Sequence, residues 1–170
     1  MVLNYKSQRV GIFVDTQNIY HSAKNLYQAR INFARLLEEA VKDRQLIRAI
    51  AYVIRSKSVE EGSFFEALEK QGFEVRLKDL QVFFGGVKKA DWDIGIAIDA
   101  IKLADKVDVV VLVTGDGDFL PLVNYLKENK GCRVEVIAFK ETASSKLIEA
   151  ADEFIDLSSQ RRKFLIKKYE

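Results

Sequence analysis

The sequence predicts an α/β fold, a three-layer α/β/α sandwich built on a doubly wound, mainly parallel sheet. Uninterrupted apolar runs at 10–14 (VGIFV) and 109–113 (VVVLV) are typical of strands buried on both faces. These runs alternate with segments in which apolar residues recur every three or four positions, as they do in helices. The expected strand order is 3-2-1-4-5, which places the first and fourth strands side by side.

The predicted elements alternate along most of the chain. Strands are expected at 10–14, 46–54, 73–77, 109–113, 133–139 and 154–157, and helices around 19–27, 33–41, 64–68, 92–104, 119–126 and Leu147. The helix at 92–104 is apolar nearly all round, which predicts burial of most of its surface. Residues 81–89 contain Gly85 and Gly86 and are predicted to form an irregular loop.

Length and composition fit one domain, expected at 1–158, followed by a basic tail at 159–170 that is predicted to be helical. A net charge of +2, from 27 basic and 25 acidic residues, indicates no particular partner. The single Cys132 excludes an intrachain disulfide and is expected in the core. With no leader and no apolar stretch of ~20 residues, we expect a cytoplasmic protein without a membrane span.

Acidic residues follow two of the predicted strands. Asp15 ends the first strand, and Asp116 and Asp118 lie in the glycine-rich turn TGDGDF after the fourth. Because ligands bind at the carboxyl ends of strands where the strand order reverses, these acids are expected to converge. Asp93, in the first turn of the helix that leads into the fourth strand, can join them.

Three carboxylates within ~5 Å of one another repel by ~3 kcal/mol per ionised pair at an effective dielectric of ~20. A cation would offset this repulsion. Oxygen ligands without a histidine or cysteine cluster favour Mg²⁺ or Mn²⁺ over zinc, so the sequence predicts such an ion on Asp15, Asp93 and Asp116. A hydrated Mg²⁺ of this kind suits attack by water on a phosphodiester.

Each of these residues also has a purely structural interpretation. Asp118 could cap the helix that follows it, and Asn18 could be a cap or turn residue. Asp91 could cap its helix, with Asp93 merely favouring the positive end of the helix dipole. Asp99 lies ~120° around the helix from Asp93, so the two cannot hold one ion from the same face.

Other catalytic motifs fit poorly. The turn TGDGDF lacks the Lys-Ser/Thr ending of a P-loop, and no G-x-G-x-x-G follows the first strand. A phosphatase with an aspartyl nucleophile at the end of the first strand would want a second Asp at the position of Gln17. The only histidine, His21, is better explained as a surface or packing residue.

Three motifs in order, FVDTQN, KADWDIGIAIDA and TGDGDFLPLV, resemble the NYN domain, in particular its LabA-like branch, a relative of PIN-domain nucleases. The likeness runs from about Val10 to Leu157 and implies a PIN-like fold and a metal-dependent ribonuclease or RNA-processing factor. It makes Asp15 the acid of the first strand, with Asn18 as its companion, and makes Asp93 the acid of the helix. It also assigns Asp116 with Asp118 to the pair after the fourth strand, and it matches Asp99 to a recurrent helix acid.

The expected function is cleavage of single-stranded RNA by an endonuclease, with Asp118 and Asn18 orienting the ion or the water and with Asp99 and Thr114 supporting the ligands. Contacts with the RNA backbone are expected first from Lys88 and Lys89, just before Asp93. Weaker candidates follow or flank other strand ends: Arg55, Lys57, Lys140 and Lys146. The basic groups at 161–163 and 167–168 could add a phosphate-facing rim or be solvated helix ends. The alternative function is a non-catalytic module that binds RNA or a protein. A phosphatase or a DNA nuclease remains open as a further activity, and the protein could form a homodimer.

Overall fold

The computed structural model describes residues 5–56, 61–82, 84–86 and 88–167. Six strands form one sheet in which every neighbouring pair is parallel. Their order confirms the predicted 3-2-1-4-5 arrangement, and the strand expected at 154–157 pairs at one edge as the sixth. In spatial order the strands are β4 (Glu74–Asp79), β3 (Gln45–Arg55), β1 (Arg9–Asp15), β7 (Val109–Val113), β8 (Arg133–Ala138) and β9 (Glu153–Asp156).

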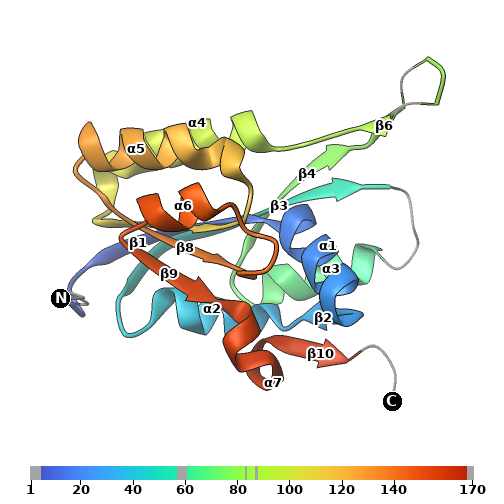
Figure 1. Ribbon diagram of the computed structural model, residues 1–170, viewed down its shortest axis with the longest axis horizontal. Helices are drawn as coiled ribbons and strands as arrows, with labels where there is room; N and C mark the ends of the chain where they lie inside the picture. The colour runs from blue at the N-terminus through green and yellow to red at the C-terminus, as the bar shows by residue number, and fades with distance from the viewer. Residues whose placement is uncertain (1–4, 57–60, 83, 87, 168–170) are drawn as a thin grey trace.

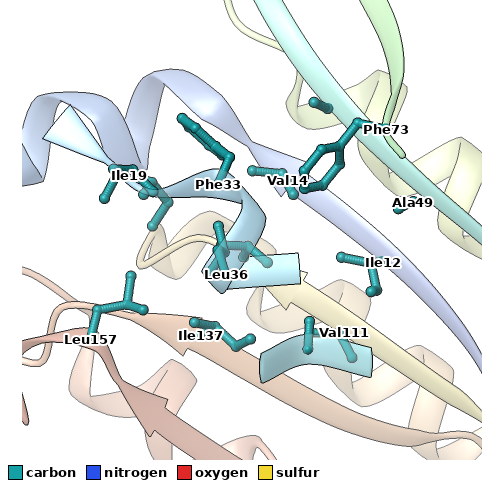
Figure 2. Close-up of a cluster of buried hydrophobic side chains, with 14 of the residues drawn as sticks. Ile12, Val14, Ile19, Phe33, Leu36, Ala49, Phe73, Val111, Ile137 and Leu157 are labelled. Atoms are coloured by element: carbon teal, nitrogen blue, oxygen red, sulfur yellow. The ribbon is translucent and has the colours of Figure 1, made fainter. Parts of the chain in front are cut away.

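Helices cover both faces of this sheet, which confirms the α/β/α sandwich (Figure 1). Ile12 and Val14 pack toward one face and Phe13 toward the other, because successive side chains of a strand alternate. Figure 2 shows the first of these two cores, with Ile12 and Val14 beside Phe33 and Leu36. The first face carries α1 (Thr16–Tyr27), α2 (Phe33–Val41) and α3 (Glu61–Lys70), and the second carries α4 (Asp93–Leu103), α5 (Leu120–Glu128) and α6 (Ser145–Ala150).

Local sequence explains where several helices begin. The Asn32 side chain accepts a hydrogen bond from the Arg35 backbone N–H at 3.1 Å and starts α2, while Ser144 caps α6 in the same way. Pro121 lies in the first turn of α5, where backbone N–H groups have no helical partner. Cys132 is buried, as expected, and its thiol donates to the Ala104 carbonyl at 3.5 Å.

The segment 81–89 is not the irregular loop that its glycines predicted. β5 (Gln81–Val82) and β6 (Lys88–Lys89) pair antiparallel and make a small two-stranded sheet of their own. Gly85 and Gly86 have positive φ angles and belong to the turn between these strands. Two-residue strands carry no alternation that a sequence pattern could reveal.

The helix α4 is buried on one face only, so the prediction that most of its surface is buried was wrong. Ile96, Ala100 and Leu103 pack against the sheet, whereas Ile94 and Ile98 are 75% and 50% exposed. A helix in the outer layer of a sandwich has one neighbour, the sheet, so only one stripe of residues reaches the core. Among the described residues, no helix has the length and apolar character needed to span a bilayer.

The basic tail contains more than a helix. After the 3₁₀ turn η3 (Leu157–Gln160), a short helix α7 (Arg161–Phe164) leads into β10 (Leu165–Lys167). β10 pairs antiparallel with β2 (Ala29–Ile31), a strand that the sequence pattern did not predict. Phe164 is 1% exposed within the first core, and Lys163 forms an ion pair with Glu39 at 2.7 Å. The tail therefore packs on the body of the protein.

Candidate metal centre

The strands β1 and β7 lie side by side at the point where the strand order reverses. The chain leaves β1 toward β3 and leaves β7 toward β8, on opposite sides of the pair. Asp15 is the last residue of β1, and Asp116 follows β7 by three positions. Such a switch point is where ligands bind in open α/β sheets.

The alternation of side chains along β1 directs Asp15 toward the face that α4 covers. Asp15 has the same parity as Phe13, which packs in the second core with Ile96 of α4. Asp93 is the first residue of α4. One carboxylate oxygen from each of Asp15, Asp93 and Asp116 lies within 4.8 Å of the others. The structure thus brings together the three residues that the sequence predicted as metal ligands.

Asp15 is held by its neighbours. The Thr114 hydroxyl donates to its Oδ2 at 3.0 Å, and Thr114 itself is 1% exposed. The backbone of Asn18 also donates to the Asp15 carboxylate. The side chain of Asn18 turns the other way, and its Oδ1 accepts the Gly115 N–H at 2.9 Å. Asn18 and Thr114 therefore fix the end of β1 to the loop after β7.

The loop after β7 presents Asp116 through a short-range hydrogen-bond pattern. The Asp116 N–H donates to the Thr114 hydroxyl at 3.2 Å, and Asp116 Oδ1 accepts the Asp118 N–H at 2.9 Å. Asp116 thus caps the 3₁₀ turn η2 (Gly117–Phe119). The proposed capping of α5 by Asp118 is wrong, because Phe119 occupies the N-cap and makes no side-chain cap bond.

Gly115 is required by close packing of this loop. A Cβ atom at Gly115 would lie 3.0 Å from the Cα of Ala143, and the Gly115 carbonyl accepts the Ser144 N–H at 2.9 Å. A larger residue would push the loop away from the segment that precedes α6. The glycine therefore sets the position of the neighbouring Asp116.

Trp92 anchors the beginning of α4 and so places Asp93. Its indole N–H donates to the Val53 carbonyl at 3.0 Å, and its ring centroid lies 5.3 Å from that of Tyr52. A Cβ atom at Gly95 would lie 2.6 Å from the Trp92 ring, so the glycine of the DWDIG motif makes room for the indole. The ammonium of Lys78 lies over the Trp92 ring, 4.5 Å from its centroid.

The three carboxylates share an unfavourable electrostatic environment. Burial raises the pKa of Asp15 to about 6, against the lowering effect of the hydrogen bonds from Thr114 and Asn18. Burial also raises the pKa of Asp93 to about 6, and the charges of Asp116 and Asp15 add to the increase. Among the described residues, no basic side chain forms an ion pair with any of the three carboxylates.

The donor set fits a hard divalent cation. All donors are carboxylate oxygens, and the described cluster includes neither histidine nor cysteine. Mg²⁺ and Mn²⁺ favour such oxygen ligands, whereas structural zinc favours sulfur and nitrogen. A divalent cation would also offset the negative charge of the neighbouring carboxylates, which adds to the effect of burial on the pKa values of Asp15 and Asp93.

Other predicted site residues lie outside this cluster. Asp99 accepts a hydrogen bond from the Tyr52 hydroxyl at 2.7 Å and pairs with Arg76 at 3.3 Å, as its geometric interpretation as a structural residue expected. His21 is exposed and packs edge-on against Tyr20. Asp91, which the sequence suggested only as a cap, accepts the Asp93 N–H at 3.1 Å and adds to the charge acting on Asp15 and Asp93. The position of Asp91, two residues before Asp93, was the sequence feature that could have placed it near the cluster.

The expected RNA contacts are distributed unevenly. Lys140 and Lys146 are exposed near the carboxyl ends of the strands. Arg55 is exposed too, but it already pairs with Asp79 at 2.8 Å. Lys88 and Lys89 are described by their backbone in β6 alone, and Lys57 lies outside the described residues.

A six-stranded parallel sheet between two helical layers, with an acidic cluster at its switch point, gives this protein a PIN-like α/β/α fold. The family model for the NYN domain matches residues 9–158. The chain belongs to the NYN domain family and, within it, to the LabA-like branch.

Individual proteins are similar to most of this chain. The chain is 26% identical to the low amplitude and bright protein LabA of Synechococcus elongatus, over 92% of this chain and 88% of the relative. It is 32% identical to the uncharacterized protein MJ0482 of Methanocaldococcus jannaschii over 89% of this chain, but it spans only 56% of that protein. A crystal structure of a protein of unknown function, VPA0982 from Vibrio parahaemolyticus, is 33% identical with a TM-score of 0.87, covering 97% of this chain and all of that one (100%).

Proposed function

We propose that this protein is a metal-dependent ribonuclease that cleaves single-stranded RNA internally by hydrolysis of phosphodiesters. The observation that carries the proposal is the convergence of Asp15, Asp93 and Asp116 within 4.8 Å, from three separate segments of the chain. Membership in the NYN domain family supports the nuclease class. The half-buried carboxylates leave the site open to a flexible strand at the edge of the sheet.

Asp15, Asp93 and Asp116 would hold one or two Mg²⁺ or Mn²⁺ ions. When bound, such an ion lowers the pKa of a coordinated water and stabilises negative charge on the phosphate. The same three carboxylates would otherwise repel a phosphodiester, so the fit of substrate depends on neutralising them.

The remaining residues of the site position these ligands. Thr114 holds the Asp15 carboxylate by its hydroxyl and, through the Asp116 N–H, ties the first ligand to the second. Asn18 holds the loop at Gly115. Asp118, two residues beyond Asp116, is exposed beside the cluster, and its negative charge acts on Asp93. Lys140 and Lys146 would contact the RNA backbone, which carries charge but no sequence information.

The test is cleavage of an end-labelled, unstructured RNA by the wild type and by Asp116→Asn, each with Mn²⁺ and with EDTA. We expect internal cleavage by the wild type in Mn²⁺ only, and a loss of at least a hundredfold in Asp116→Asn. Asp105→Asn, which removes an exposed carboxylate paired with Lys130, is the matched control and should cleave normally.

If neither the wild type nor Asp116→Asn cleaves the RNA under any condition, the enzyme proposal is wrong. Tight RNA binding without turnover would instead favour a non-catalytic module that uses the same acidic cluster. Cleavage that persists in EDTA would contradict the role assigned to the three carboxylates.

A further inference from the structure

A cavity of about 520 Å³ lies outside the acidic cluster, between α1 and the small sheet of β2 and β10. Its walls include Tyr20, Lys24 and Tyr27 from α1, Arg30 from β2, and Lys167 from β10. A cavity of this size falls in the range of ~300 to 1,000 Å³ that is usual for ligand sites. Both strands that shape it were absent from the sequence pattern, so the cavity could not be foreseen.

Among the described residues, every charged side chain that lines this cavity is basic, and the nearby Glu141 carboxylate accepts a hydrogen bond from the lining Tyr27. Lys24, Arg30 and Lys167 line it, and no carboxylate is among its lining residues. None of these cations forms an ion pair within the described part of the chain, unlike Lys163 nearby, which pairs with Glu39. Three exposed cations around one hollow are complementary to a polyanion.

Aromatic residues accompany these cations. Tyr20, Lys24 and Tyr27 are spaced four and three residues apart, so they share one face of α1. Tyr27 is already engaged, because its hydroxyl donates to Glu141 at 2.7 Å and the Arg161 guanidinium lies 4.9 Å from its ring centroid. Tyr20 is half-buried, and its hydroxyl has no hydrogen-bond partner among the described residues. Its ring is the aromatic surface that a base could use.

The helix α1, which lines the cavity, begins next to the acidic cluster in the sequence. α1 begins directly after Asp15, and Tyr20 follows Asp15 by five residues, or ~7 to 8 Å along a helix axis. Figure 1 shows α1, β2 and β10 gathered at the end of the molecule toward which the arrowheads of β3 and β9 point. An anionic strand that reaches the cluster at this end needs attraction elsewhere, because the cluster itself is negative.

We propose that this cavity binds the same single-stranded RNA as the acidic cluster, with the Tyr20 ring stacking on a base and the three cations contacting phosphates. This inference rests on the proposed function, because it takes RNA as the substrate. Aromatic stacking together with a basic groove is the usual way in which proteins hold single strands without reading their sequence.

The experiment measures binding of a fluorescent 12-nucleotide RNA to Asp116→Asn protein by anisotropy, across a series of salt concentrations. The triple variant Lys24→Gln, Arg30→Gln, Lys167→Gln should reduce the slope of log Kd against log salt by about 2, since each phosphate contact contributes ~0.7 for single strands. Tyr20→Ala should weaken binding roughly fivefold to a hundredfold with an unchanged salt slope, and Tyr20→Phe should restore it.

A matched control removes three exposed lysines at the opposite, amino-terminal edge of the sheet, by Lys70→Gln, Lys102→Gln and Lys106→Gln. These changes should leave affinity and slope near those of the parent. Thermal unfolding of each variant shows whether the fold is intact. Equal effects of the two triple variants, or none from Tyr20→Ala, would overturn the inference.

The inference and the proposed function can fail separately. Unchanged RNA binding and cleavage in the cavity variants would overturn the inference and leave the ribonuclease intact. RNA binding that depends on the cavity, in a wild type that never cleaves, would support the inference and refute catalysis. Failure of the wild type to bind the RNA at all, for example because the hollow instead takes an acidic protein segment, would overturn both.

Discussion

Two carboxylate sites in this protein, one buried and one half-buried, differ in whether a basic side chain accompanies them. Near the amino ends of the strands, Arg44 and Glu135 have side chains only 1% and 0% exposed and form two hydrogen bonds of 2.9 and 2.8 Å. Arg133 adds a third bond to Glu135 at 2.9 Å. At the carboxyl ends, Asp15 and Asp93 sit beside Asp116 without a basic partner among the described residues.

The pKa values show the difference. Burial acts to raise the pKa of Glu135, but the hydrogen bonds from Arg44 and Arg133 outweigh it and hold the pKa below its ordinary value. Burial raises the pKa of Asp15 and of Asp93 to about 6, and neighbouring carboxylates add to the rise. Basic side chains accompany the buried Glu135, whereas no basic side chain among the described residues pairs with the acidic cluster at the switch point. The missing charge at the cluster is therefore expected from a bound cation.

Removing Arg44 tests the paired region most severely. Arg44→Met should lower the free energy of unfolding by about 3 to 5 kcal/mol, because Glu135 would keep its burial and lose its main partner. Urea unfolding measures this loss. Arg35→Met removes one member of an exposed ion pair with Glu38 at 3.5 Å and should change stability by less than ~1 kcal/mol. Similar losses in both variants would show that burial of the pair is unimportant.

Adding metal tests the unpaired region. Mn²⁺ at a hundred times its Kd should raise the free energy of unfolding by about 2.7 kcal/mol, because it binds the folded state alone. Differential scanning calorimetry with and without Mn²⁺ measures the increase. The increase should persist in Asp105→Asn and vanish in Asp116→Asn. A shift of equal size in Asp116→Asn would place the ion elsewhere.

Weakening the support of Asp15 should have a smaller effect. Thr114→Val keeps the shape of the buried side chain but removes the hydroxyl that donates to Asp15 and accepts from the Asp116 N–H. Partners outside the ligand set typically contribute ten- to a hundredfold to metal affinity, and we expect a loss in that range by Mn²⁺ titration calorimetry. Thr142→Val, which removes an exposed hydroxyl bonded to Ser22, is the control. Unchanged affinity in Thr114→Val would remove Thr114 from the site.

Neutralising Asp15 should stabilise the metal-free protein, the reverse of the change at Arg44. The folded-state pKa of Asp15 lies above its ordinary value of 3.8, so its stabilising contribution is complete below about pH 4 and is lost as the pH rises through about 6. Asp15→Asn should therefore be more stable than the wild type by up to about 3 kcal/mol at pH 7 in EDTA, with the gain vanishing near pH 4. Urea unfolding at both pH values measures it, and a gain that does not depend on pH would contradict this cause.

The convergence of the acids could be predicted because it depends on topology more than on detail. Asp15 and Asp116 end or follow apolar strands, and a single assumption about strand order makes those strands neighbours. Asp93 could be placed because its helix leads straight into β7. The sequence could not predict that Asp116, and not Asp118, is the residue with a capping hydrogen bond. Both residues lie close enough to the start of the helix to fit a turn that precedes it.

Features that depend on packing escaped the sequence pattern. Glu135 lies within a strand and Arg44 ninety-one residues before it, and nothing local indicates that they meet. The strands β2 and β10 have three residues each, too few to show alternation. The exposed Ile94 and Ile98 of α4 follow from its place in the outer layer, whereas composition alone suggested burial.

The pairing of β10 with β2, with Phe164 inserted beneath, bears on where this chain can be shortened. The match to the NYN family model stops at residue 158, yet the packed structure of the described residues extends beyond it. A truncation at residue 158 would remove Phe164 and leave a cavity in the first core. It would also leave the edge of β2 without its paired strand, and unpaired strand edges promote self-association. A fragment trimmed by family boundaries alone would thus aggregate more readily than the longer chain.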